Sequence, residues 1–168
     1  MKCALILFGV CRELEISSKS WSFMEHFKPD VYISTWDRYT IKNTKLDIHI
    51  DKEITKDYLQ GYFPNAIISL QKELSLFSDD PYNHNEKMIY HWKNALRLIK
   101  ESNKEYDILI LSRFDVYIKI DSWEDKINPE YLYTTAGDLD LKSLHDIFFI
   151  GNFNSLSSFI EDRKSTRL

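Results

Sequence analysis

Glycine is scarce in this chain, and the few glycines lie far apart. The 168 residues include four, Gly9, Gly61, Gly137 and Gly151. A dinucleotide-binding G-x-G-x-x-G turn and a phosphate-binding G-x-x-x-x-G-K-[ST] loop both need closely spaced glycines, because their backbone N–H groups must approach the phosphates. Neither motif can be written in this sequence. Any nucleotide must therefore be held by other groups.

Cysteine is also scarce, and basic side chains are outnumbered by acidic ones. The spacing of Cys3 and Cys11 matches neither C-x-x-C nor C-x5-R, which disfavours zinc, thioredoxin-like and phosphatase sites. Two thiols that pack as small apolar groups are typical of a reduced compartment. With 22 Lys and Arg against 26 Asp and Glu, the net charge is -4, so there is no excess of positive charge for tracking a nucleic-acid backbone. We expect no nucleic-acid partner.

Apolar runs are short. The run Cys3–Cys11 falls well below the roughly 18 residues of a membrane-spanning segment. Lys2 is the only charged residue before it and no small-residue cleavage site follows, which disfavours a secretory signal. We interpret the run as a buried strand and expect a cytoplasmic protein with no transmembrane segment, associated with a membrane at most peripherally.

The remaining composition is that of a folded domain, with 43% hydrophobic, 14% aromatic and 29% charged residues. Because a single core usually holds roughly 100 to 200 residues, one domain is expected. We assign residues 1–160 to this domain and residues 161–168 to a polar tail that should fray.

Strand and helix patterns alternate along the chain. Continuous apolar runs at Ala4–Phe8 and Asp107–Leu111 are typical of strands covered on both faces, and Asn85–Ser102 carries apolar residues at helical spacing. Further strands are indicated at Val31–Trp36, Leu46–Ile50, Ala66–Leu70, Tyr131–Thr135 and Ile147–Ile150, and further helices from Ser17 or Ser18 to Pro29, at Thr55–Tyr62 and from Asn154. This order predicts an α/β fold with three α/β/α layers and a mainly parallel, Rossmann-like sheet.

Polar residues follow the predicted strands at the points where the strands end. Ligands of parallel sheets bind beyond the carboxyl ends of the strands, so these positions are the first candidates for a site. After the first strand, Gly9 permits a tight turn and Arg12 offers a forked donor that matches a phosphate. After the second, Asp37 is suited to accept hydrogen bonds from a ribose or a base. Arg12 as a solvated partner of a neighbouring glutamate and Asp37 as a turn cap are the structural alternatives.

The segment after Asp107–Leu111 carries Arg113 and Asp115. Asp115 is suited to a divalent cation, Mg2+ or Mn2+, since hard cations are commonly bound by one or two carboxylates and phosphate oxygens. Residues two apart on an extended chain share a face, so Arg113 would pair a phosphate or fix the carboxylate. A purely structural ion pair is the alternative. Trp36 and Tyr117 are candidates for stacking on a base or sugar, with core packing as the commoner use.

His145 and Asp146 precede the predicted strand Ile147–Ile150. A histidine beside an acid can supply a metal ligand or a general base, and a polar strand start is the structural alternative. The spelling Asp-x-Asp occurs at residues 138–140, but no strong apolar strand leads into it, and we interpret these acids as solvated. The other histidines, among them His91, show no ligand spacing and are expected on the surface or on a helix face.

Four patches of the sequence, in this order, resemble glycosyltransferases of surface polysaccharide and lipopolysaccharide synthesis, including the WavE-like group. The patches are ALILFGVCRE, PDVYISTWD, YDILILSRFDVYI and HDIFFIG. The resemblance implies a GT-A type nucleotide-sugar fold in which an acidic motif after a central strand binds a divalent metal and the donor diphosphate. Here Asp115 matches the metal-binding acid and Arg113 replaces the first aspartate of D-x-D. That replacement leaves open whether the metal is needed or arginine neutralises part of the phosphate charge.

The same resemblance implies sugar transfer from a nucleotide-activated donor to a glycan or glycolipid acceptor. Gly9 and Arg12 match the family's strand-end nucleotide contact, and Asp146 matches the acid before its late strand. Asp146 or His145 would then act on the acceptor side. The alternative is a shortened, non-catalytic module of the same fold that binds a nucleotide or a protein.

Overall fold

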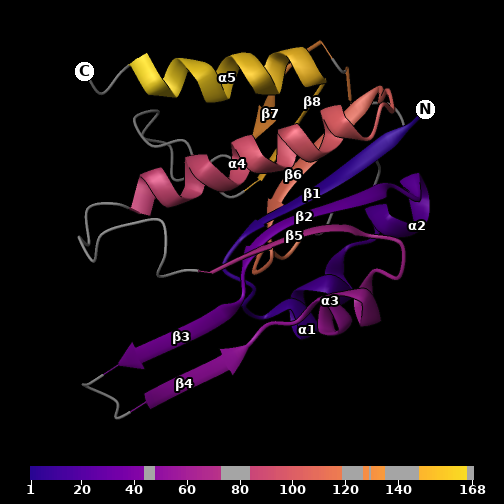
Figure 1. Ribbon diagram of the computed structural model, residues 1–168. Coiled ribbons are helices and arrows are strands. Elements are labelled where there is room, and N and C mark those ends of the chain that lie inside the picture. The colour runs from indigo at the N-terminus through magenta and orange to yellow at the C-terminus, as the bar shows by residue number, and fades with distance from the viewer. Residues whose placement is uncertain (44–47, 73–83, 119–126, 129, 135–147, 166–168) are drawn as a thin grey trace.

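The computed structural model describes residues 1–43, 48–72, 84–118, 127–128, 130–134 and 148–165 (Figure 1). Its centre is a six-stranded sheet with the strand order β5-β2-β1-β6-β8-β7. The strands are β1 (Cys3–Gly9), β2 (Asp30–Trp36), β5 (Ile67–Gln71), β6 (Ile108–Arg113), β7 (Tyr133–Thr134) and β8 (Phe148–Gly151). Strands β5, β2, β1 and β6 are parallel neighbours, whereas β8 pairs antiparallel with both β6 and β7. The mostly parallel sheet expected from the sequence is confirmed.

Strand β1 lies at the centre of the core because it has a strand on each side and helices over both faces. Residues Ala4 to Phe8 are at most 1% exposed. Successive side chains of a strand point to opposite faces. Leu5 and Leu7 accordingly pack in one apolar cluster, while Ala4 and Ile6 pack in the other. The continuous apolar run of the sequence thus reflects burial on both faces.

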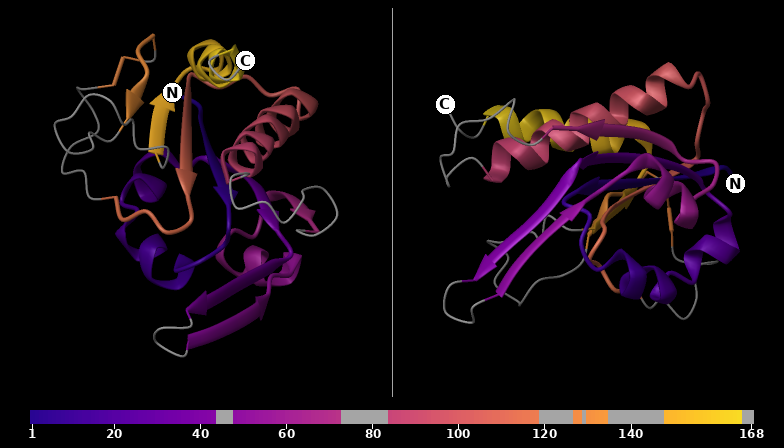
Figure 2. Two further views of the ribbon diagram at one scale, coloured as in Figure 1. Left: turned by 90° about the vertical axis from the view of Figure 1, so that its left-hand side faces the viewer. Right: turned by 60° about the horizontal axis from the view of Figure 1, so that its bottom comes forward.

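Helices cover both faces of the sheet (Figures 1 and 2). One face carries α1 (Leu14–Ser17), α2 (Phe23–Phe27) and α3 (Lys56–Tyr62), and the other carries α4 (His84–Glu101) and α5 (Phe153–Ser165). Apolar residues of α4 at helical spacing, among them Trp92, Ala95 and Ile99, are at most 3% exposed and pack on the sheet. The three-layer α/β/α arrangement predicted from the sequence is therefore present.

The helix expected from Ser17 or Ser18 to Pro29 is wrong as a single element. The structure has α1, a 3-10 turn at Ser18–Ser20, and α2. Trp21 separates the last two because its backbone leaves the helical region, with φ -85° and ψ 70°. Its indole N–H donates to the Val116 carbonyl at 2.7 Å. A contact from a distant part of the chain thus fixes the break.

Two further boundaries differ from the expectation. Instead of one weak strand at Leu46–Ile50, the antiparallel pair β3 (Arg38–Asn43) and β4 (Ile48–Glu53) projects from the body of the molecule (Figures 1 and 2). Helix α5 continues to Ser165, beyond the boundary predicted at residue 160. Each added helical residue gains a backbone hydrogen bond once a helix is nucleated, so a polar stretch can extend a packed helix.

Candidate arginine–aspartate site

The strand order creates a switch point between β1 and β6. From β1 the chain moves to β2 and β5 on one side, and it then returns to β6 on the other side of β1. In open α/β sheets, ligands bind beyond the carboxyl ends of the strands at such a point. Phe8 near the end of β1 is in register with Arg113 at the end of β6. The segments Gly9–Arg12 and Arg113–Asp115 therefore leave the sheet side by side.

A left-handed glycine begins the turn after β1. Gly9 has φ 86°, a conformation in which glycine carries no steric cost. The Thr35 hydroxyl donates to the Gly9 carbonyl at 2.6 Å, and the Arg12 N–H donates to the Val10 carbonyl at 2.9 Å. Glu13, in the left-handed region with φ 56°, then starts α1. This compact turn brings Arg12 within hydrogen-bonding distance of Asp115, two residues beyond the end of β6.

Arg12, Arg113 and Asp115 meet at the switch point. Arg113 donates from Nε and Nη2 to the two carboxylate oxygens of Asp115 at 2.9 and 2.6 Å. Nε of Arg12 donates to Oδ2 of the same carboxylate. The Asp115 side chain is 13% exposed, against 39% for Arg12 and 32% for Arg113. The cluster has a net positive charge, with its one negative group shielded and its two positive groups reaching solvent.

Hydrogen bonds from the α1 region fix the backbone around Asp115. The Ser17 hydroxyl donates to the Phe114 carbonyl and the Trp21 indole to the Val116 carbonyl, while the Ile118 N–H donates to the Ser20 hydroxyl at 3.0 Å. The side chains of Phe114, Val116 and Ile118 are buried. The carboxylate therefore stands on a segment that packing and hydrogen bonds hold in one conformation.

Cys11 lies in the same turn as Arg12 but is a structural thiol. Cys11 and Cys3 are each 4% exposed and belong to the apolar cluster on the face of the sheet that α1, α2 and α3 cover. Burial raises the pKa of each thiol to about 12. A neutral, enclosed thiol is a poor nucleophile, which confirms the expectation that these cysteines pack as apolar groups.

Asp37 leaves β2 at the same edge of the sheet. Its N–H donates to the Gln71 carbonyl at 2.7 Å, and its carbonyl accepts from the Ile54 N–H at 2.9 Å. The Asp37 backbone thus joins the projecting β-hairpin to the sheet, in agreement with a turn role. Contact between its carboxylate and a ribose or base stays a prediction.

The two aromatic stacking candidates have different surroundings. Trp36 is 2% exposed, stacks on Tyr90 with ring centroids 5.8 Å apart and meets His91 edge-on. Core packing is the correct interpretation for Trp36, and a role in ligand stacking is wrong. Tyr117 is 55% exposed and lies two residues beyond Asp115. It remains the aromatic candidate at the site.

The acceptor-side candidates lie outside the described residues. His145, Asp146 and the Asp138–Asp140 stretch all fall within residues 135–147. Their predicted roles, acceptor chemistry for the first two and solvation for the third, stay predictions.

A buried polar network that the sequence did not reveal lies between α4 and the sheet. His91 is 1% exposed, and its Nδ1 is 2.8 Å from the Ser34 hydroxyl. The Asn94 amide donates to the hydroxyls of Ser34 and Ser69 at 3.0 and 2.8 Å. Burial lowers the pKa of His91 to about 4. His91 thus lies on the sheet-facing side of α4, and its spacing within the apolar stripe of that helix was the available signal.

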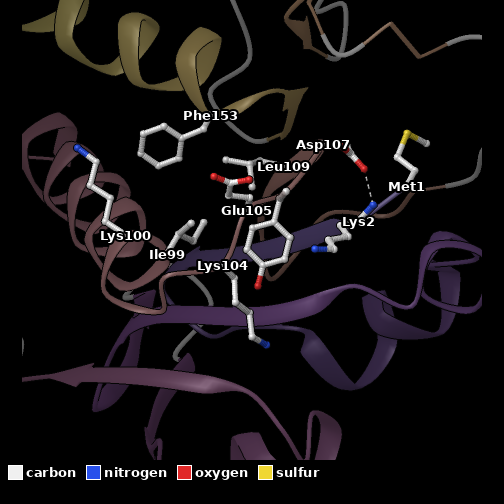
Figure 3. Close-up of a pocket in the computed structure, with 10 residues that line it drawn as sticks. Met1, Lys2, Ile99, Lys100, Lys104, Glu105, Asp107, Leu109 and Phe153 are labelled. Atoms are coloured by element: carbon white, nitrogen blue, oxygen red, sulfur yellow. Dashed lines mark hydrogen bonds between the residues drawn. The ribbon is translucent and has the colours of Figure 1, made fainter.

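An open cavity of about 730 Å³ lies at the opposite, amino ends of the parallel strands, near the start of β1 and β6. Figure 3 shows Phe153 and Lys100 on one side of it and the N–H of Lys2 donating to Asp107, at 2.7 Å, on the other. None of the predicted site residues lines this cavity. Because ligands of such sheets bind at the carboxyl ends of the strands, the cavity is not the candidate site.

A divalent cation fits poorly on Asp115 in the observed arrangement. Both carboxylate oxygens already accept hydrogen bonds from guanidinium groups, and a guanidinium has no lone pair to offer a metal. Hard cations require several oxygen ligands. Across the part of the chain that the structure describes, no three His, Cys, Asp or Glu side chains come together as a metal-binding group. In the observed arrangement the two arginines therefore occupy the Asp115 carboxylate, and its metal role stays a prediction.

Fold and site together define an α/β protein with a mostly parallel sheet, compatible with a Rossmann-like fold, and an arginine–aspartate cluster at its switch point. No protein-family model matches the chain, and a search of curated proteins gives no match. Among the described helices, none is both long and apolar enough to cross a membrane.

Proposed function

We propose that this protein is a glycosyltransferase that moves a sugar from a nucleotide-activated donor to a glycan or glycolipid acceptor. The observation that carries the proposal is the meeting of Arg12 and Arg113 on Asp115 at the switch point between β1 and β6. Guanidinium groups match the geometry and charge of phosphate oxygens. The resemblance to glycosyltransferases of the GT-A type supports the same location, since it implies donor binding after a central strand.

The two arginines suit the departure of a nucleoside diphosphate. In sugar transfer, the bond between the anomeric carbon and the diphosphate oxygen breaks, and the acceptor oxygen forms a new bond to that carbon and loses its proton. Negative charge grows on the leaving diphosphate. Positive groups already in place stabilise such charge without reorganising, and this is the role we assign to Arg12 and Arg113. Asp146 or His145 would receive the proton of the acceptor hydroxyl.

The nucleoside would extend from this cluster along the carboxyl edge of the sheet. Asp37, at the end of β2, would accept hydrogen bonds from the ribose or base, and exposed Tyr117 would stack on a ring. The Gly9 backbone permits close approach of the donor between these groups. We place the reaction in the cytoplasm, because both thiols are buried and unpaired, as in a reducing compartment. A glycolipid acceptor would bring the protein to a membrane surface.

A screen of nucleotide sugars for binding and turnover tests the proposal. We expect at least one donor to bind and to release its nucleoside diphosphate, and Arg12→Ala and Arg113→Ala to abolish the release. Arg97→Ala, on the exposed outer side of α4, is the control and should keep it. Binding without turnover for every donor and acceptor would contradict the transferase and favour a non-catalytic module. Absence of all binding would contradict both.

A further inference from the structure

We propose that Arg12 and Arg113 bind the donor diphosphate directly, with no divalent cation on Asp115, and that Asp115 is a positioning residue for the two guanidinium groups. The identity of the ligand as a donor diphosphate rests on the proposed function. The anion-binding character of the site rests on the cluster itself.

The hydrogen-bonding pattern of the carboxylate is the first argument. Its two oxygens receive three donations, from Nε and Nη2 of Arg113 and from Nε of Arg12. A cation on either oxygen would displace a guanidinium N–H or lie beside two positive charges. The two guanidinium groups neutralise the carboxylate of Asp115. They thereby remove the attraction that a hard cation needs. Asp115 is therefore committed to the arginines.

The donors left on the arginines are the second argument. Within the described residues, the side-chain hydrogen bonds of the two arginines use only Nε of Arg12 and Nε and Nη2 of Arg113. The other N–H groups of both guanidiniums are available to an anion, and both side chains reach solvent at 39% and 32% exposure. A structural ion pair would need one arginine. The second arginine gives the cluster its net positive charge at the carboxyl ends of the strands, where ligands bind.

Rigidity of the carboxylate is the third argument. Asp115 lies between Phe114 and Val116, whose carbonyls accept from Ser17 and Trp21 and whose side chains are buried. Guanidiniums anchored on a fixed carboxylate are already oriented, so less side-chain entropy is lost when the anion binds. Orientation by Asp115 takes the part that a metal ion would play in gathering phosphate oxygens.

Calorimetric titration of the full chain with inorganic pyrophosphate tests the inference, first in EDTA and then with Mg2+ or Mn2+. We expect binding in EDTA that the metals do not strengthen. Arg12→Ala and Arg113→Ala should each weaken it about tenfold or more, as the loss of charge-assisted hydrogen bonds does. Lys104→Ala removes one positive charge from an exposed pair at the opposite edge and should change nothing. Binding that requires a metal would overturn the inference.

Asp115→Asn separates positioning from metal ligation. The variant should still bind pyrophosphate in EDTA, with a steeper dependence on salt concentration, because the site has gained positive charge. An unchanged salt dependence would show that the anion does not bind beside Asp115 and would contradict the inference. If wild-type binding needs Mg2+ or Mn2+ and Asp115→Asn abolishes it, Asp115 is a metal ligand and the inference is wrong. Should an alanine variant lose its folded circular dichroism spectrum, Arg113→Lys, which keeps the charge and loses the fork, replaces it and should also weaken binding.

Failure of the inference and failure of the proposed function give different results. Pyrophosphate bound in EDTA through the arginines, with no nucleotide sugar bound or turned over, contradicts the sugar-transfer proposal and leaves the anion site intact. A nucleotide sugar turned over only with a metal contradicts the inference and leaves the proposed function intact. Absence of pyrophosphate binding under every condition overturns the inference.

Discussion

The free energy of unfolding should fall as the pH is lowered from neutrality, and buried His91 should account for a large part of the fall. His91 is 1% exposed, is hydrogen bonded through Nδ1 to Ser34, and has no partner for Nε2 within the described residues. Trp36 and Tyr90 pack against its ring. Burial lowers its pKa to about 4 from an ordinary 6.5, so the folded chain keeps the ring neutral under conditions that protonate the unfolded chain.

The size and sign of the effect follow from that difference in pKa. Below pH 6.5 the unfolded chain binds a proton at His91 and the folded chain does not, so each pH unit costs about 1.4 kcal/mol of stability. The loss ends near pH 4, where the folded state also binds the proton. In all, about 3 kcal/mol should disappear as the pH falls through this window, a large share of the roughly 5 to 15 kcal/mol that stabilises a typical domain.

Urea unfolding of the wild type and His91→Gln between pH 7.5 and pH 4 measures the effect. Glutamine keeps a hydrogen-bonding group toward Ser34 and takes up no proton in this range. The free energy of unfolding of the wild type, relative to that of His91→Gln, should therefore fall by about 3 kcal/mol between pH 7.5 and pH 4. This change does not depend on which protein is more stable at neutral pH. His26→Gln replaces an exposed histidine and controls for the loss of a histidine as such. Parallel pH profiles for wild type and His91→Gln would refute the reasoning.

Three further outcomes are expected. Gly9→Ala should lower the free energy of unfolding by about 1 to 2 kcal/mol, because φ is 86° at that position. Gly61 lies in a helix with open space around it, so Gly61→Ala should raise the free energy of unfolding by up to about 1 kcal/mol. Equal urea midpoints for the two variants would contradict this. Ser17→Ala should cost about 1 to 3 kcal/mol, since the Phe114 carbonyl loses the Ser17 hydroxyl as its donor, and a melt unchanged from wild type would be the contrary result. Cys3 and Cys11 should resist alkylation at pH 8 until urea unfolds the chain, since burial raises their pKa to about 12; rapid labelling of folded protein would contradict that.

The centre of the sheet was predictable because strands β1 and β6 are buried on both faces. The continuous apolar runs at Ala4–Phe8 and Asp107–Leu111 correspond to β1 and β6, and the helical spacing at Asn85–Ser102 corresponds to α4. Elements held by distant contacts were not predictable in the same way. Trp21 interrupts a helical pattern because it reaches the Val116 carbonyl, which no local pattern records.

The candidate site could likewise be predicted only in part, because some of its contacts join residues that are distant in the sequence. Spacing alone placed Arg113 beside Asp115, and the structure confirms their pairing. Arg12 is separated from Asp115 by 103 residues along the chain, and only the strand order brings the two together. His91 shows the converse case: a polar residue within an apolar stripe is buried here because Ser34, on a strand far away in sequence, offers a hydrogen-bond partner.

The most direct test of the arginine–aspartate site is an NMR titration that follows side-chain Nε–Hε signals of the arginines and backbone amide signals as pyrophosphate is added in EDTA. We expect the Nε–Hε signals of Arg12 and Arg113 and the amide signals after β1 and β6 to shift together, saturably, while the amide signals of Phe153 and Lys100 at the opposite cavity do not shift. Shifts centred on that cavity, with the signals of both arginines unchanged, would contradict it.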